Sequence, residues 1–352
     1  VISSNFALSE QELNLVIPSP IEITAIEDVE DEYHDPHGFR LSDSGLYLIG
    51  EDDKPDLWIC DPLKVVAVTR NSEGESWGKV LEWRDADGRL HTWSMPLSIL
   101  AGDGSEFRAR LLDGGLNISP GRKQREGLIR YLQESKPAQR MFCTARVGWH
   151  GCSFVLPGMT IGGSQEVILQ SESETPLRQS GTLTEWQESI GRSCLGNSRL
   201  IFAVSAALAG PLLHLCDEGS GGFHLVATSS TGKSTALQVA GSVLGGGGKA
   251  GFCQSWRATS NGLESIAEAH NDLTLILDEL AQCDPKEAGE VAYMLSNGAG
   301  KNRMKAAGGL RRRPSWRLCF LSAGEITLAD HLSGVGRKAR GGQEVRLINI
   351  RA

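Results

Sequence analysis

A nine-residue segment in the second half of the chain has the residue types of a phosphate-binding loop. It follows an apolar run, Phe223 to Val226, and precedes a helix-like run that begins at Ala236. In such a loop, backbone N–H groups wrap a phosphate, Lys233 adds a positive charge at the β- and γ-phosphates, and the dipole of the following helix reinforces the anion site. The pattern predicts a nucleotide-binding loop made of Ala227, Thr228, Ser229, Ser230, Thr231, Gly232, Lys233, Ser234 and Thr235.

One position departs from the usual pattern G-x-x-x-x-G-K-[ST], because the first glycine is Ala227. A small residue is tolerated there if its φ is negative. The tripeptide G-K-[ST] alone also occurs in chains that bind no nucleotide, so the strand before the loop and the helix after it are what favour the motif.

Paired carboxylates at the end of a second apolar run complete the expected site. Residues 273–279 read Leu-Thr-Leu-Ile-Leu-Asp-Glu, which is typical of a buried strand that ends in Asp278 and Glu279. Asp278 would hold Mg²⁺ together with the hydroxyl of Ser234, and Glu279 would polarise the attacking water. A core strand that ends in two acids by chance is the alternative, and the phosphate loop upstream argues against it. The expected cofactors are ATP and Mg²⁺.

Other polar residues could contact the γ-phosphate. The strand expected at 316–322 ends in Ser322, where ring-forming ATPases carry a polar sensor, and Glu325 is the second candidate. An ordinary helix N-cap explains Ser322 equally well.

An arginine at a subunit edge reaches the γ-phosphate of a neighbouring subunit as a trans-acting finger. Arg337 and Arg340 are the candidates, with simple surface charge as the alternative, whereas Arg346 lies inside an expected strand and is interpreted as structural.

Basic residues gather before the strand at 316–322. Two basic arms flank the glycine pair at 308 and 309, which is the composition of a hairpin that projects from the sheet. In a ring of subunits such a hairpin faces the central channel, where Lys and Arg follow a phosphate backbone. A solvated surface loop is the alternative. The candidates for binding nucleic acid are Lys301, Arg303, Lys305, Arg311, Arg312 and Arg313.

The net charge of −8 is unevenly distributed. Residues 301–352 carry 12 Lys and Arg against three acids, in a chain that is acidic as a whole. One concentrated basic strip indicates a localised contact with a polyanion rather than a contact over the whole surface.

Strands and helices are expected to alternate in the second half. Helices are expected within 186–216 and at 233–244, 261–270, 285–296 and 326–332, and strands at 223–226, 250–256, 273–278, 316–322 and 345–350. This alternation predicts a parallel sheet covered on both faces. A single helix–strand–helix unit between the loop and Asp278 is expected of AAA+ and related ring ATPases.

The first half has the short alternating strands of a different domain. Strands are expected at 58–60 and 65–69, with a hairpin of 80–84 and 89–95, a helix at 124–135 and a polar linker near 171–184. We therefore expect a β-rich α+β domain of unknown role at 1–175 and a P-loop, AAA+-like ATPase domain at 176–352. The sequence ends at Ala352, so a C-terminal lid is expected to be absent.

The composition favours a globular protein of the cytoplasm. The 352 residues are 40% hydrophobic and 22% charged. No signal peptide is expected in this sequence, which starts at Val1 rather than Met and so leaves the presence of residues upstream of it open. The most apolar stretch, Leu200 to Cys216, is short for a membrane span and contains Pro211 and His214, which predicts a buried helix and no membrane partner. Eight scattered cysteines without a C-x-x-C pair are expected to be reduced.

Eight segments form a recognisable set. They are Gly221 to Val226, the loop at 227–235, Trp256 to Glu264, Leu277 to Leu280, Tyr293 to Gly298, Leu321 to Glu325, Asp61 to Leu63 and Gly148 to His150. Together they resemble the bacterial and phage family called domain of unknown function 927, over nearly the whole chain. Members look like superfamily three helicases in their ATPase core and often accompany primase-type domains in mobile elements. At the sensor position, where superfamily three usually has Asn, this chain has Ser322-Ala323.

Two functions from different classes fit these residues. The resemblance implies an ATP-dependent DNA helicase or translocase motor of a phage or mobile-element replication system, assembled as a hexameric ring on single-stranded DNA with a primase domain or partner. The alternative is a nucleotide-switched DNA-binding or regulatory module without unwinding activity. A basic hairpin and a finger arginine favour the motor, because a switch needs neither. A small-molecule kinase would need a substrate lid, which we do not find in the sequence.

Overall fold

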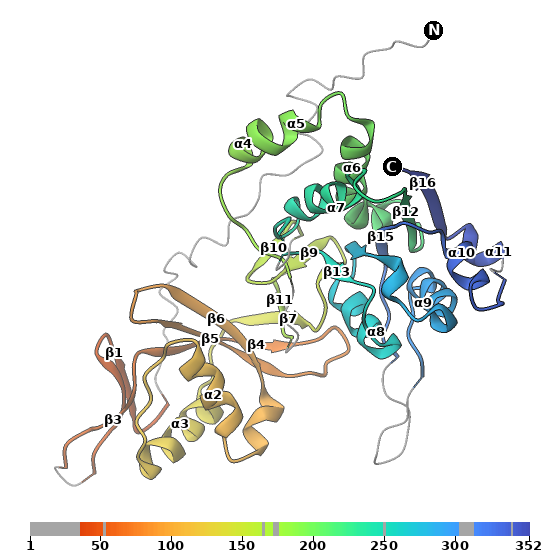
Figure 1. The fold of residues 1–352 in the computed structure, drawn as a ribbon. Coiled ribbons are helices and arrows are strands. Elements are labelled where there is room, and N and C mark those ends of the chain that lie inside the picture. The colour runs from red at the N-terminus through yellow and green to blue at the C-terminus, as the bar shows by residue number, and fades with distance from the viewer. Residues whose placement is uncertain are drawn as a thin grey trace. The chain divides into compact units, whose positions relative to one another are not determined.

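The computed structural model describes residues 36–51, 54–163, 166–171, 176–248, 251–302, 313–338 and 341–352. They form two compact units (Figure 1). The first unit comprises the described residues up to Ala145 and those of 150–172, and the second comprises Arg146–Trp149 and those from 173 to Ala352. The boundary expected after residue 175 falls in a stretch, 172–175, that lies outside the described residues.

The first unit is built mainly of strands. β5 and β6 form the expected hairpin, in which Leu81 lies opposite Trp93 and Arg84 opposite Leu90. They belong to a five-stranded sheet of order β11-β7-β4-β5-β6, and a three-stranded sheet has the order β1-β2-β3. The strands from the first unit and its border are β1 (Phe39–Ser42), β2 (Gly45–Leu48), β3 (Leu57–Cys60), β4 (Leu63–Arg70), β5 (Gly78–Arg84), β6 (Leu90–Pro96), β7 (Arg140–Thr144), β8 (Gly148–His150), β9 (Ser153–Leu156), β10 (Met159–Ile161) and β11 (Val167–Leu169).

Helices α2 (Ser105–Asp113) and α3 (Arg122–Glu134) share one core with these strands, and the short helix η1 (Leu97–Ala101) packs beside them. A buried lysine closes α3: the Nζ of Lys79 donates to the carbonyl oxygens of Leu132, Gln133 (3.1 Å) and Ser135 (2.7 Å). A cation there satisfies the last carbonyls and complements the helix dipole. Burial lowers the pKa of Lys79 to about 8.

The second unit contains a five-stranded sheet of order β13-β14-β15-β12-β16, in which every neighbouring pair is parallel. The strand expected at 273–278 is β14 (Leu273–Asp278), and the two expected later strands begin two residues further on, as β15 (Leu318–Gly324) and β16 (Leu347–Arg351). β12 (Gly221–Val226) leads into the candidate phosphate loop, and β13 (Gln254–Ser255) is shorter than expected.

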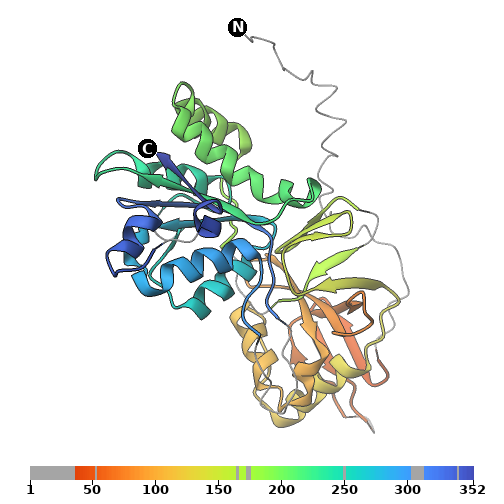
Figure 2. The same cartoon turned by 90° about the vertical axis from the view of Figure 1, so that its right-hand side faces the viewer.

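Helices cover both faces of this sheet, as the alternation predicts (Figures 1 and 2). One face packs α6 and α7 against Ile276 and Leu321, and the other packs α8, α9 and α10 against Leu275 and Phe320. The helices are α4 (Leu183–Trp186), η2 (Gln187–Gly191), α5 (Arg192–Cys194), α6 (Ser198–Leu215), α7 (Lys233–Ser242), α8 (Ser260–Ala269), η3 (Leu280–Gln282), α9 (Pro285–Asn297), α10 (Leu328–Ser333) and α11 (Gly341–Glu344).

The helix predicted at 200–216 is present as α6, but it is buried on one face only. The prediction of burial was wrong for the opposite face. The small residues of α6 allow a close approach to β14, where the Thr274 hydroxyl donates to the carbonyl oxygens of Ala206 (2.8 Å) and Ala207 (3.1 Å). On the opposite side Leu208 and Leu212 are each 53% exposed. Among the described residues α6 is the one helix long and apolar enough to cross a bilayer, by length and composition alone, and its docking on β14 is that of a helix covering a sheet.

His270, at the end of α8, makes the second unit sensitive to acid. Its Nδ1–H donates to the carbonyl oxygen of Ile266 at 2.7 Å, while its buried Nε2 has no hydrogen-bond partner in the part of the chain that is described. Burial lowers the pKa of His270 to about 4. An unfolded histidine has a pKa near 6.5. The unfolded chain therefore binds more protons between pH 6.5 and pH 4, and stability is lost as the pH falls through that window.

We expect His270 to remove about 2 kcal/mol from the free energy of unfolding between pH 7 and pH 5, and His270→Leu to abolish that loss. Urea unfolding of both proteins at the two pH values measures it. Between pH 7 and pH 8 the two proteins should change nearly in parallel, because His270 is then neutral in the folded state and mostly neutral in the unfolded state. Equal losses on acidification would show that this histidine does not couple folding to pH.

Candidate functional site

The candidate phosphate loop connects β12 to α7 and has a distinctive backbone. Ser230 and Gly232 have positive φ values, of 62° and 89°. Glycine adopts such a conformation freely, whereas a serine there is strained. Ala227 is not among the described residues with positive φ, so the condition for a small residue in place of the usual glycine is met. Its N–H donates to the carbonyl oxygen of Gly324 at 3.4 Å, which fixes the start of the loop to the end of β15.

Lys233 is the first residue of α7, and its side chain is folded back under the loop. Its Nζ donates to the carbonyl oxygens of Ala227 and Thr228, both at 2.7 Å, and the residue is only 8% exposed. The hydroxyl of Thr231 also donates to Thr228 (3.1 Å). The ammonium group of Lys233 is therefore held at the N-terminus of α7, where the free N–H groups and the helix dipole favour binding of an anion.

The paired carboxylates lie at the same edge of the sheet as the loop. Asp278 ends β14, and β15 lies between β14 and β12. Since parallel strands have their carboxyl ends at one edge, the topology brings Asp278 and Glu279 to the edge that carries the loop. Glu279 has φ 60° and ψ 77°, a left-handed conformation that is uncommon for a residue with a side chain and is concentrated at functional sites.

Two side chains at this edge of the sheet, a hydroxyl and a carboxylate, have oxygen atoms of the kind that Mg²⁺ prefers. Ser234 is exposed in the first turn of α7, and Asp278 is half-buried at the end of β14. Mg²⁺ is usually bound by one or two protein oxygens, several waters and substrate phosphates, so this donor set fits it. The described residues contain no group of three or more His, Cys, Asp or Glu that could hold a metal by themselves.

Ser322 is completely buried and belongs to a hydrogen-bonded chain that the sequence did not predict. The Nε2 of His224 lies 3.0 Å from the carbonyl oxygen of Ile326, so this nitrogen carries the hydrogen. The Nδ1 of His224 therefore accepts from the Ser322 hydroxyl (2.9 Å), whose oxygen accepts from the indole N–H of Trp256 (2.8 Å). Burial lowers the pKa of His224, which keeps the ring neutral.

Two roles were expected for Ser322, an N-cap and a contact with the γ-phosphate. The N-cap alternative is wrong, because Thr327 caps α10 and forms a capping box with Asp330. A direct contact with phosphate stays a prediction, although the hydroxyl of Ser322 already has two partners. Glu325, the second candidate, is exposed and directly follows the residue whose carbonyl oxygen accepts from the loop.

The candidate finger arginines lie beyond α10. Arg337 is exposed, and its Nη1 donates to the carbonyl oxygen of Lys286 in the first turn of α9 (2.5 Å). Arg340 lies outside the described residues. Arg346 lies over the ring of Tyr293, 4.8 Å from its centroid, which fits the structural role expected of it.

The expected basic hairpin has an ordered base. Ala299 and Ser315 form an antiparallel bridge, the N–H of Gly300 donates to the carbonyl oxygen of Pro314 (2.9 Å), and the Nε of Arg313 donates to that of Gly300 (2.7 Å). We call residues 298–301 and 313–316 the neck. Two antiparallel segments are what the base of a hairpin requires. Lys301 is exposed on the neck, whereas Arg303, Lys305, Arg311 and Arg312 lie outside the described residues.

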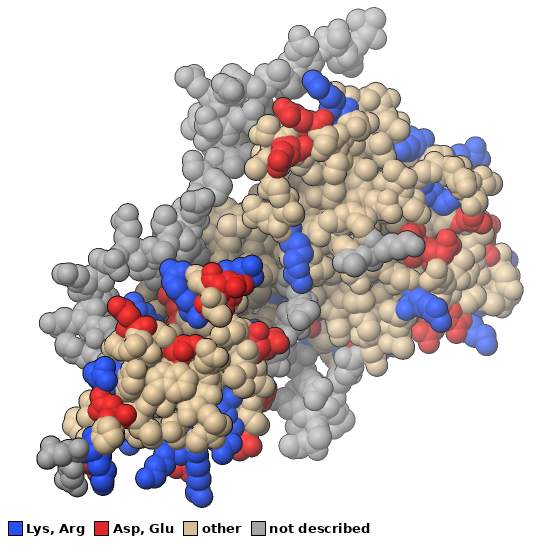
Figure 3. Space-filling model, turned by 60° about the vertical axis from the view of Figure 1, so that its left-hand side comes forward, with Lys and Arg blue, Asp and Glu red and all other residues tan. Residues whose placement is uncertain are grey.

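Elsewhere the surface is not uniformly basic. On the described part of the face drawn in Figure 3, Lys and Arg are interspersed with Asp and Glu rather than gathered in one field.

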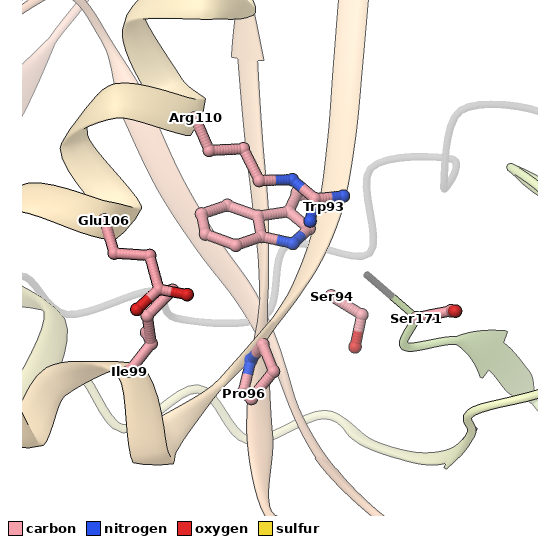
Figure 4. A pocket seen from close by; sticks show the side chains of 7 residues that line it. All are labelled: Trp93, Ser94, Pro96, Ile99, Glu106, Arg110 and Ser171. Atoms are coloured by element: carbon pink, nitrogen blue, oxygen red, sulfur yellow. The ribbon is translucent and has the colours of Figure 1, made fainter. Parts of the chain in front are cut away.

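A separate small pocket lies in the first unit, next to β6 and α2 (Figure 4). Its volume is about 80 Å³, and the guanidinium of Arg110 stacks over the ring of Trp93 in its wall at 4.6 Å. None of the candidate nucleotide residues lines it. It is lined by Trp93, Ser94, Pro96, Ile99, Glu106, Arg110 and Ser171.

The structure thus defines a mixed α/β protein whose parallel sheet gathers a lysine-bearing loop and two carboxylates at one edge. Residues 39–315 match the family described as "Domain of unknown function (DUF927)". The chain belongs to this family, as its motifs predict.

One of the solved structures has a similar fold. The structure named "SCCmec type IV Cch - active helicase" is 19% identical and superposes with a TM-score of 0.66 over 90% of this chain. The chain covers 58% of that protein's length. Two structures of NtrX from Brucella abortus, with ADP and with ATP, are 13% and 12% identical and cover 50% and 82% of this chain and 38% and 67% of theirs. Their TM-scores, 0.26 and 0.25, are too low to carry an argument. No curated protein matches the chain.

Proposed function

We propose that this chain is an ATP hydrolase that drives movement along DNA, as a helicase or translocase motor of a phage or mobile-element replication system. The observation that carries the proposal is the edge of the parallel sheet at which Lys233 is held under the loop, Asp278 ends the strand β14 and Glu279 follows it. The similarity of fold to a structure named as an active helicase supports it.

In the proposed reaction, the backbone N–H groups of residues 228–235 and the N-terminus of α7 bind the phosphates of ATP. Lys233 exchanges the carbonyl oxygens of Ala227 and Thr228 for oxygens of the β- and γ-phosphates. Ser234 and Asp278 would hold Mg²⁺, and the ion would supply positive charge to neutralise those phosphates. Glu279 accepts a hydrogen bond from the attacking water and aligns it with the γ-phosphorus.

The chain of Trp256, Ser322 and His224 would give this site its rigidity. It ties β15 to β12, and through Ile326 it reaches the residue before the N-cap of α10. A buried polar chain with every member satisfied specifies one arrangement of the strands that carry it. The distance between the loop and the carboxyl end of β15, near Ser322, would then stay constant during turnover.

Single-stranded DNA is the proposed polyanion, and the hairpin above the neck is its proposed contact. We expect the triple variant Arg311→Gln, Arg312→Gln, Arg313→Gln to lower the salt slope of single-strand binding by about 2, at roughly 0.7 per lost phosphate contact. ATP hydrolysis without DNA should persist, because the phosphates of ATP are bound elsewhere. Binding titrations at several salt concentrations, with ATPase rates with and without DNA, measure both effects.

A matched control removes the same charge from the first unit, at exposed positions of α3: Arg122→Gln, Lys123→Gln, Arg125→Gln. It should leave the salt slope unchanged. Equal slopes in wild type and hairpin variant would mean that the hairpin is a solvated loop, and an ATPase that DNA does not stimulate would favour the nucleotide-switched module.

A ring, hexameric in our proposal, would let Arg337 or Arg340 act on the neighbouring site. Each arginine changed to Ala should stop hydrolysis by assembled protein, and mixing with Lys233→Ala protein should restore part of it, because that partner supplies an intact arginine to a competent site. ATPase assays on mixtures, with the mass of the complex measured in ATP and Mg²⁺, test this. No restoration at any mixing ratio would argue against a trans role.

A further inference from the structure

Four residues that interrupt the first unit in sequence belong to the second unit in space. Arg146–Trp149, which we call the strap, is flanked by Ala145 and His150 of the first unit. Within the second unit the strap contacts the turn between α8 and β14: the backbone N–H of Trp149 donates to the Asp272 carboxylate (2.9 Å), and the side-chain amide of Asn271 donates to the carbonyl oxygen of Val147 (2.9 Å).

The backbone of the strap is fixed in register. Gly148 has φ 102°, and a Cβ added to it would lie 2.4 Å from the Asp272 carboxylate. Asp272 itself has φ 53°, and its carboxylate also accepts from the side chain of Asn271 (2.9 Å). A residue with a side chain at position 148 would therefore have to displace a buried carboxylate that organises the turn.

The same residues hold the segment that emerges from the neck. The side-chain oxygen of Asn271 accepts from the backbone N–H of Arg317 (3.0 Å), and the N–H of Asp272 donates to the carbonyl oxygen of Arg317 (2.6 Å). The guanidinium of Arg317 donates to the Nδ1 of His214 (2.6 Å), and His214 stacks on Trp149 at 5.7 Å between centroids. The indole N–H of Trp149 donates to the carbonyl oxygen of Pro211 (2.8 Å).

Arg146 contacts the neck directly. Its Nη1 donates both to the carbonyl oxygen and to the hydroxyl of Ser315, each at 2.8 Å, and Ser315 is the residue that bridges to Ala299. Two bonds from one charged nitrogen to one residue restrain that residue more than a single neutral bond does. The strap thus contacts one arm of the neck at Ser315 and reaches the start of β15 through Asn271 and Arg317.

We infer that Arg146 is a positioning residue for nucleic-acid engagement: through Ser315 the strap holds the neck, which carries the exposed basic residues Lys301 and Arg313. The inference rests on the proposed function. Arg146 is not one of the proposed phosphate contacts, and it is not part of the proposed nucleotide site. Loss of its two bonds should loosen the neck without removing any of its charge, so that each DNA contact costs more ordering entropy.

The test compares Arg146→Met with wild type. Methionine keeps an apolar stem and removes the donors. We expect single-strand affinity and DNA-stimulated hydrolysis to fall about tenfold, with the rate without DNA unchanged. The salt slope should remain that of wild type, because no phosphate contact is lost. Hydrogen exchange should rise at the neck amides of Gly300 and Trp316, which donate across the two arms.

Two further proteins separate the possible failures. Arg199→Met is the control, because it removes a hydrogen bond from Arg199 to the carbonyl oxygen of Arg351 in the edge strand β16. This variant should behave as wild type. If the triple hairpin variant of residues 311–313 binds DNA normally, the proposed function fails, whatever Arg146→Met does. If the hairpin variant loses binding while Arg146→Met retains wild-type affinity and neck exchange, the positioning role of Arg146 is overturned and the proposed function stands.

Discussion

Lys233→Ala is expected to weaken the binding of Mg·ATP by two orders of magnitude or more and to abolish hydrolysis. The ammonium of Lys233 is nearly buried and is held by the carbonyl oxygens of Ala227 and Thr228, so it lies where phosphate oxygens would replace those carbonyls. Removing a charge-assisted contact to phosphate costs about 3 kcal/mol, which corresponds to roughly a hundredfold in affinity. Calorimetric titration with ATP in the presence of Mg²⁺ measures the change.

The control is Lys123→Ala, which removes an exposed lysine of α3 in the first unit. It should bind ATP like wild type. Thermal unfolding of Lys233→Ala shows whether the loop variant is folded. A folded Lys233→Ala protein with wild-type affinity for ATP would disprove the assignment of residues 227–235 as a phosphate loop.

Glu279→Gln should separate binding from turnover. The amide has the shape of the carboxylate and can occupy the same left-handed backbone, but it does not polarise water. We expect kcat to fall by about 10²- to 10⁴-fold, with ATP affinity kept within a few-fold of wild type. Single-turnover hydrolysis and an independent binding titration give the two quantities.

Glu287→Gln is the matched control, because Glu287 is an exposed glutamate in the first turn of α9. Its turnover should be that of wild type. Hydrolysis by Glu279→Gln at a rate near wild type would assign the activation of water to another group, and the exposed Glu325 would be the next to test.

Local pattern located the strands of the second unit, although β13 is shorter than expected, and it did not give their order in the sheet. A run of apolar residues closed by Asp278 predicts β14 because a strand buried on both faces is apolar throughout. That β15 lies between β14 and β12 depends on pairing between strands distant in sequence, which no local pattern encodes. The chain of Trp256, Ser322 and His224 follows from that order, since it joins residues 66 and 98 positions apart.

The half-exposed face of α6 shows a similar limit. The composition of 200–216 predicts an apolar helix, and the helix is present as α6. Apolarity alone does not say how much of the helix the sheet can cover. The small side chains of Ala203 and Ala207 mark the covered side, and this spacing was the available signal for a one-sided helix.

The strap also has a consequence for dividing the protein into parts. A fragment that starts at Ser173 would contain the whole parallel sheet and every candidate nucleotide residue, yet it would lack Arg146–Trp149. The buried carboxylate of Asp272 would lose the N–H of Trp149, and Ser315 would lose Arg146. Each lost hydrogen bond involves a charged group and contributes about 1.5–3 kcal/mol. During synthesis the strap emerges long before its partners, with 169 positions between Arg146 and Ser315. The strap can therefore make all its contacts with the second unit only after residue 317 has been made, when the polypeptide of the first unit on both sides of the strap has already been synthesised.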